Sequence, residues 1–143
     1  MRQNVLRGLG GLAGLFLLIQ LVPYGRDHTN PPVRAEPSWA SPEVRALAVR
    51  ACFDCHSNES KWPWYSHVAP VSWLVAHHVE DGRKHLNFSQ WDEKQKHAKD
   101  AAEVVREGEM PMKGYVLMHA EAKLTDAEKQ QLVDAFGAMF GEK

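Results

Sequence analysis

The segment Cys52-Phe53-Asp54-Cys55-His56 constrains this chain more than any other part of its sequence. The spacing C-x-x-C-H is that of covalent c-type haem attachment. Two thiols three positions apart at a helix end can each form a thioether with a vinyl group of one porphyrin, and the adjacent histidine places its imidazole under the iron. The sequence therefore predicts one haem c, attached through Cys52 and Cys55, with His56 as an axial ligand of the iron.

Other chemistries use two cysteines at this spacing, and the rest of the sequence disfavours them. A thioredoxin-like C-x-x-C follows a strand in an α/β pattern, which this sequence lacks. A zinc site needs more cysteines or a well-spaced pair of histidines, whereas His77 and His78 are adjacent. A disulfide between Cys52 and Cys55 would close too small a loop to stabilise a fold much.

Apolar residues recur at helical spacing after residue 40, and no alternating strand pattern competes with them. Ser41-Pro42-Glu43 combines an N-cap, a proline at the first helical position and an acid in the first turn, which predicts a helix that carries both cysteines. A second helix is expected to begin at Pro70 and to end within residues 82–85. The 143 residues allow one domain of ordinary size, which these patterns predict to be all-α.

Two capping boxes predict the remaining helices. The first, Ser89 with Asp92, predicts a helix that ends at Gly108. The second, Thr125 with Glu128, predicts a final helix, whose inner face should consist of Leu132, Val133, Phe136, Met139 and Phe140.

The amino terminus contains the longest apolar stretch of the chain. Residues 5–22 are apolar or glycine apart from Arg7 and Gln20. A helix over residues 5–24, at about 1.5 Å per residue, would be about 30 Å long, the thickness of a bilayer core. We therefore expect residues 1–24 to be an uncleaved signal-anchor in the bacterial inner membrane, with the remainder in the periplasm. A cleaved signal peptide is the alternative, although LVPYGRD offers no small-x-small cleavage site.

The next segment is rich in proline and poor in apolar residues, with prolines at positions 23, 31, 32 and 37. This composition favours extended conformations over packing. We expect residues 25–40 to be a linker and residues 41–140 to be the folded haem-binding domain. The chain holds 17 Lys and Arg against 18 Asp and Glu, a balance that does not suggest nucleic-acid binding.

The second axial ligand of the iron is left open by the residues alone. Met110-Pro111 follows the helix-stopping Gly108 on an irregular segment that could reach the iron, so Met110 is the first candidate. Met112 and Met118 are rival sulfur ligands. The histidines that would give bis-histidine ligation are His77, His78, His85 and His119.

Six motifs occur in one order along the chain: DCHSNE, KWPWYS, APVSWL, HV-x-x-GR, LNFS-x-W and GEMP. In this the chain resembles the haem-binding domain family of small bacterial exported proteins, which are related to monohaem cytochromes c. The resemblance covers residues 40–140. It implies a small cytochrome c-like helical domain wrapped around one covalent haem on Cys52 and Cys55. It also implies that His56 is the proximal ligand and that Met110, from GEMP, is the distal one.

The surroundings of the haem follow from its chemistry. A haem-ligating histidine donates its other ring N–H to a carbonyl, which in cytochromes c belongs to a proline after the motif. Pro70 is the candidate here, and Pro63 is the alternative. Arg83 could pair with a propionate, or it could be a solvated surface residue. Aromatic residues that could line the porphyrin and donate to a propionate, or form ordinary core, are Trp62, Trp64, Tyr65 and Trp73.

The expected function is that of a membrane-anchored periplasmic cytochrome that passes single electrons between redox partner proteins, without a catalytic residue of its own. His/Met ligation and burial of the haem both raise the reduction potential. One alternative is a haem-based redox or gas sensor in which the distal bond breaks. Another is a small peroxidase-like enzyme with an open distal site and an acid–base group. Carbon monoxide binding by the reduced protein separates the carrier from both alternatives.

Overall fold

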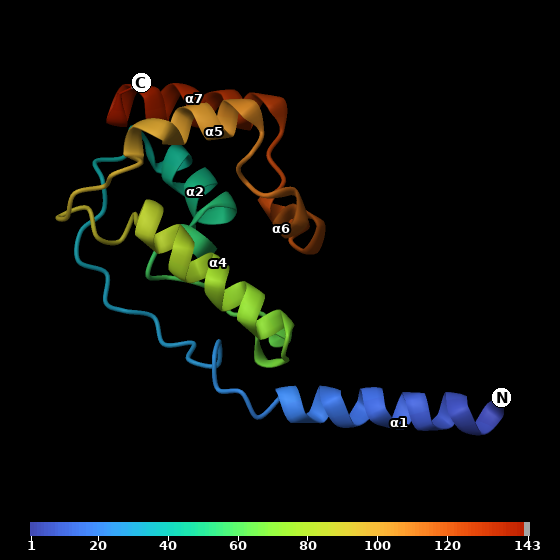
Figure 1. Cartoon of the computed structure of the whole chain (residues 1–143). Coiled ribbons are helices and arrows are strands. Elements are labelled where there is room, and N and C mark those ends of the chain that lie inside the picture. Colours follow the sequence, from blue (N-terminus) through green and yellow to red (C-terminus); the bar gives the residue numbers. More distant parts are fainter. Residues whose placement is uncertain (142–143) are drawn as a thin grey trace. The chain divides into compact units, whose positions relative to one another are not determined.

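The computed structural model describes residues 1–141, and over these residues the chain is all-helical, as the sequence predicts. This part of the chain forms no β-strand, and Ala35 and Gln90 pair as an isolated parallel bridge. The helices (Figure 1) are α1 (Arg2–Ile19), α2 (Pro42–Ala51), α3 (Phe53–His56), α4 (Val71–His85), α5 (Ala101–Glu107), α6 (Lys113–Met118) and α7 (Asp126–Phe140). Short 3₁₀ turns are η1 (Trp64–His67), η2 (Ala98–Asp100) and η3 (Ala120–Ala122).

The chain divides into two compact units. The first comprises residues 1–29 and 62–78, and the second comprises residues 30–61 and the chain from residue 79 onwards. Residues 71–78 of α4 therefore belong to the first unit and residues 79–85 to the second. The cysteines, His56 and Met110 all lie in the second unit.

The core of the second unit forms where α2, α5 and α7 meet. α5 packs along α7, and α2 contacts both α7 and α3 (Figure 1). The most deeply buried large side chains include Phe88, Leu132 and Phe136. The ring of Phe88 lies 5.6 Å from that of Phe53 in α3 and 6.0 Å from that of Phe136 in α7. Burial of each such side chain contributes about 1.5–3 kcal/mol, so this cluster holds the short cysteine-bearing helix α3 against the core.

The predicted beginnings of α2 and α7 are confirmed. The Ser41 hydroxyl accepts the N–H of Val44 at the start of α2. At the start of α7, Thr125 Oγ1 accepts the N–H of Glu128, while the Glu128 carboxylate accepts the N–H of Thr125. These bonds satisfy amide groups that the first turn of a helix leaves without partners.

Two helix predictions need correction. The helix expected to carry both cysteines ends before Cys52, where the backbone turns out of the helical region at φ −127° and ψ −35°, and α3 begins at Phe53. The helix expected from Ser89 begins only at Ala101, after η2. Ser89 does not cap a helix, because its hydroxyl accepts the N–H of Asn58 instead. The predicted end at Gly108 is confirmed, with φ +76°.

The predicted membrane-spanning helix is not supported by the structure. None of the helices within residues 1–141 is both long enough and apolar enough to cross a membrane. α1 ends at Ile19 rather than at Tyr24, and it includes Arg2 and Arg7.

The first unit contains α1 and a link between its end and the segment before α4. The side-chain amide of Gln20 accepts the N–H of Ala69 and donates to the carbonyl oxygen of the same residue, both at 2.9 Å. Because one side chain satisfies both backbone groups of Ala69, this buried residue needs no secondary-structure partner.

No helix forms within residues 25–40, which the sequence predicts to be a linker, and residues 30–40 of this segment belong to the second unit. The N–H of Arg34 donates to the carbonyl of Ser89, and the N–H of Trp91 donates to that of Ala35. The Glu36 carboxylate accepts two bonds from Arg45, at 2.6 and 2.7 Å. Backbone and side-chain groups of residues 34–36 thus bond to the second unit, which composition alone does not indicate.

Candidate haem site

The imidazole of His56 is fixed by two backbone carbonyls. Its Nδ1 lies 3.0 Å from the carbonyl oxygen of Gly82, in the last turn of α4, and 3.0 Å from that of Leu86, directly after the helix. Carbonyls only accept, so Nδ1 carries the proton and Nε2 keeps its lone pair. Burial lowers the pKa of His56, which favours the neutral ring. His56 therefore presents the nitrogen lone pair that an iron ligand must supply.

The sequence predicts that the Pro70 carbonyl accepts the ring N–H of His56. This prediction is wrong, because the carbonyls of Gly82 and Leu86 accept it. The Pro70 carbonyl instead accepts the N–H of Trp73 at the start of α4. The alternative, Pro63, accepts two bonds from Ser66 within η1. Each proline carbonyl is thus used in its own local turn.

Gly82 allows α4 to approach the cysteine motif closely. A Cβ atom added to Gly82 would lie 2.5 Å from the carbonyl oxygen of Cys55 and 3.1 Å from the Cys55 Cβ. No real Cβ atom tolerates the shorter distance, so the backbones must separate if any side chain is added. Glycine at this position is therefore a condition for the His56 geometry.

Replacing Gly82 with alanine is expected to separate α4 from Cys55 and to lower the free energy of unfolding by about 1–3 kcal/mol. The urea midpoint of the protein measures this effect. Gly114→Ala is the matched control, because nothing lies within 4 Å of a Cβ added at Gly114 in α6. Equal midpoints for the two variants would show that the approach at Gly82 does not matter.

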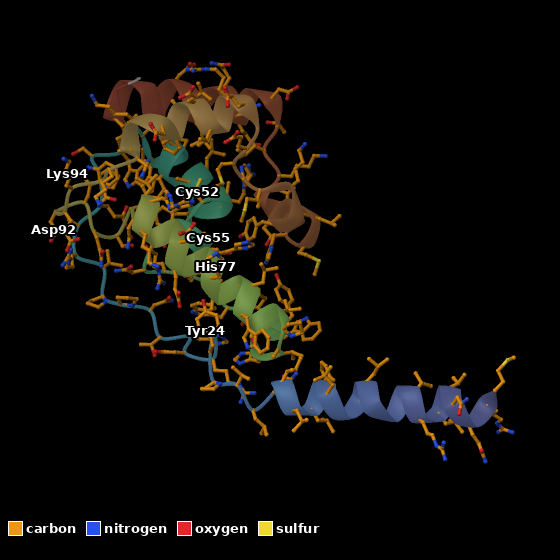
Figure 2. All side chains as sticks on the ribbon, in the orientation of Figure 1. Tyr24, Cys52, Cys55, His77, Asp92 and Lys94 are labelled. Carbon is orange, nitrogen blue, oxygen red and sulfur yellow. The ribbon has the colours of Figure 1, made fainter. Side chains whose placement is uncertain are left out.

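Cys52 and Cys55 are free thiols at the junction of α2 and α3 (Figure 2). The amides of Cys55 and His56 both donate to the carbonyl of Cys52, which closes the turn of the motif. Burial raises the pKa of the Cys52 thiol to about 12, and burial with the neighbouring Asp54 charge raises that of Cys55 to about 11. Both sulfur atoms are thus protonated at neutral pH.

Met110 is held at the end of α5. After Gly108 ends this helix, the amides of Glu109 and Met110 both donate to the carbonyl of Val104, at 3.0 and 3.1 Å. The Met110 side chain is half-buried and packs against the same hydrophobic core as Cys52. The rival Met118 is 63% exposed on α6. Met110 and the cysteine motif therefore share one core, and coordination by Met110 stays a prediction.

Arg83 holds the segment that follows the motif. Its Nε donates to the carbonyl of Ser57 at 2.8 Å, and its Nη2 donates to Asn30 Oδ1 and Ser60 Oγ at 2.9 and 3.0 Å. The guanidinium thus has a structural role that the sequence did not indicate. Its pairing with a propionate stays a prediction.

The sequence analysis missed a buried amide network behind His56. The Asn87 side chain donates to Asn58 Oδ1 and accepts the N–H of Ser89, while Ser89 Oγ accepts the N–H of Asn58, all at 2.9 Å. Beside it, the N–H of Phe88 donates to the carbonyl of His56 at 2.8 Å. The motifs DCHSNE and LNFS-x-W contain these residues. Their asparagines were the sequence feature that could have indicated the network.

The four aromatic candidates all lie in the first unit. Trp62 stacks on His28 with ring centres 4.4 Å apart, and Trp64 is 78% exposed. Within residues 1–141, the ring nitrogens Trp62 Nε1, Trp73 Nε1 and His28 Nε2 are buried without a hydrogen-bond partner. A buried donor without an acceptor costs about 1–3 kcal/mol, so the two indole N–H groups suit an acceptor from a bound molecule. Their contact with haem, like that of Tyr65, stays a prediction.

The donors of the second unit fit a haem. The motif supplies two free thiols at the attachment spacing, and His56 supplies an imidazole whose Nε2 lone pair is available. Met110 adds a thioether sulfur, which is one of the usual second ligands of haem iron. Among residues 1–141, no three His, Cys, Asp or Glu side chains gather as ligands of one metal ion.

A comparison with models of protein families matches the haem-binding domain over residues 14–137. The match covers most of the chain and includes the motif, α4, Met110 and most of α7. Comparisons with the curated proteins and with the solved structures found no match. On its sequence match and its donor set, this chain belongs to the haem-binding domain family.

Proposed function

We propose that this protein is a monohaem c-type cytochrome that carries single electrons. Cys52 and Cys55 would hold the haem through thioethers, and His56 and Met110 would be the protein ligands of its iron. The haem supplies an iron that accepts and releases one electron reversibly. The observation that carries the proposal is the position of the His56 ring, whose Nδ1 lies 3.0 Å from two carbonyl oxygens, so that Nε2 is left with its lone pair.

The chain's own residues would tune the potential of the bound group. The carbonyls of Gly82 and Leu86 increase the basicity of the His56 ring by accepting its N–H. A thioether ligand from Met110 favours the reduced state of iron and raises the potential. Because covalent attachment of haem takes place outside the cytoplasm, we propose that the protein works in the periplasm with separate redox partner proteins.

A second candidate function is a sensor or ligand-binding module in which Met110 is displaced. The observation that favours it is the exposure of α6, which follows Met110 and contributes no buried residue. A segment with few buried contacts opens more easily than the core does. Displacement of the distal ligand would then change the contacts that this segment offers to a partner.

The visible spectrum of protein matured in a periplasm distinguishes the two functions. It should be recorded oxidised, reduced, and reduced in the presence of carbon monoxide. For an electron carrier we expect sharp low-spin bands that carbon monoxide does not change, because both axial positions are filled, and a weak sulfur-to-iron band when oxidised. A spectrum that shifts with carbon monoxide would contradict the carrier and favour the sensor.

A further inference from the structure

Asp54 lies between the two cysteines, directly before Cys55, and both of its carboxylate oxygens accept hydrogen bonds. Oδ2 accepts the hydroxyl proton of Tyr115 at 2.5 Å, and Oδ1 accepts the N–H of Lys61 at 3.1 Å. The first of these bonds joins α3 to α6 across 61 positions of the sequence. The haem-attachment motif is therefore linked directly to the segment that follows Met110.

The phenol of Tyr115 is in the right state to donate this bond. Tyr115 is half-buried, and burial together with the hydrogen bond to Asp54 raises its pKa above the usual range, so the hydroxyl keeps its proton. The ring is also held in orientation, because it stacks on His119 with ring centres 4.2 Å apart. A hydrogen bond to a charged acceptor is stronger than one between neutral groups.

The rest of α6 offers little burial. The helix has no buried residue, and Leu117 and Met118 are 84% and 63% exposed. Before it, the segment is anchored at the end of α5 by the amide of Met110, and after it Ala122 is buried. Between these two anchors, the Asp54–Tyr115 hydrogen bond ties the segment to the motif.

We propose that Tyr115 and Asp54 are positioning residues that hold the Met110 segment against the haem-attachment motif. Their hydrogen bond, the Asp54–Tyr115 link, sets how readily an external ligand displaces Met110. This role rests on the proposed function, since it requires Met110 to be the distal ligand. The link would act through the position of the segment.

Imidazole, added to the oxidised holoprotein at pH 7, is the probe. It competes with Met110 for the iron, and its binding is followed by the change in the main haem absorption band, which every variant has whether or not a sulfur ligand is present. Tyr115→Phe removes the hydroxyl and keeps the ring, so we expect imidazole to bind about tenfold more tightly, the scale of one hydrogen bond to a charged group. Tyr24→Phe, which removes a hydroxyl in the first unit, is the matched control and should bind like the wild type.

Asp54 tests the other end of the link. Asp54→Ala should bind imidazole as tightly as Tyr115→Phe does, and the double variant should bind no more tightly than either, because the two residues act through one bond. Asp54→Asn keeps an acceptor oxygen and should lie closer to the wild type. Additive effects of the two single variants would overturn the link.

Met110→Ala separates failure of the link from failure of the proposed function. If Met110→Ala binds imidazole more tightly while Tyr115→Phe behaves as the wild type, the link is wrong and the ligand assignment stands. If Met110→Ala binds imidazole as the wild type does, Met110 is not the ligand, and both the assignment and the link are wrong.

Discussion

Replacing both Cys52 and Cys55 with alanine will abolish covalent attachment of haem, because a thioether bond needs the cysteine sulfur. Extraction with acidified acetone measures the effect. All haem of the double variant should move into the organic phase, whereas the haem of the wild-type protein should stay with the polypeptide. Haem that remained with the variant polypeptide after extraction would refute attachment through these residues.

The double variant should keep the fold of the wild-type protein, so loss of haem can be attributed to the missing thiols. Both thiols are free, and neither accepts or donates a bond on which a helix end depends, since the turn of the motif is closed by backbone groups. Cys52 packs only partly against the core, so removing its sulfur leaves a small gap. Circular dichroism of the variant should therefore show the helical content of the wild type.

Replacing Met110 with alanine will leave haem attached but will shift its iron toward high spin. The physical reason is loss of the Met110 thioether, after which the iron would have a weak second ligand or none. The weak sulfur-to-iron band of the oxidised protein should disappear completely. The free energy of unfolding should also fall by about 2–3 kcal/mol, because the Met110 side chain packs against the core.

Met112→Ala and Met118→Ala are the matched controls for this experiment, since each removes one thioether from the same stretch of chain. Both should keep the low-spin spectrum of the wild type. A low-spin spectrum in Met110→Ala, together with its loss in one of the controls, would transfer the distal position to that methionine.

Features of the fold that depend on neighbouring residues were predictable from the sequence. The caps at Ser41 and Thr125 and the helix end at Gly108 each depend on a few adjacent residues, and all three lie where the pattern places them. Ser89 shows the limit of such reasoning. Its hydroxyl can cap a helix, but Asn58, 31 positions away, donates to it instead, and local sequence carries no sign of that competitor.

The same distinction applies to the candidate site. The motif predicts Cys52, Cys55 and His56 as haem-binding residues by its spacing alone. The partners of the His56 N–H are carbonyls of Gly82 and Leu86, and backbone groups leave no signature in side-chain identity. The prediction of a membrane-spanning helix at the amino terminus is not supported for another reason. Apolar composition does not determine where a helix ends, and α1 ends at Ile19.

The two carbonyls that hold the His56 ring would also affect the rate of the electron exchange that we propose. The His56 ring is bonded at Nδ1 to two backbone oxygens, and it cannot rotate without breaking these bonds. The backbone of His56 is held as well, because its carbonyl accepts the N–H of Phe88. The orientation of the ring would therefore be the same whether Nε2 were bound to oxidised or to reduced iron. Groups fixed before a charge moves need no rearrangement when it does, so His56 would contribute little to the reorganisation energy that limits such reactions.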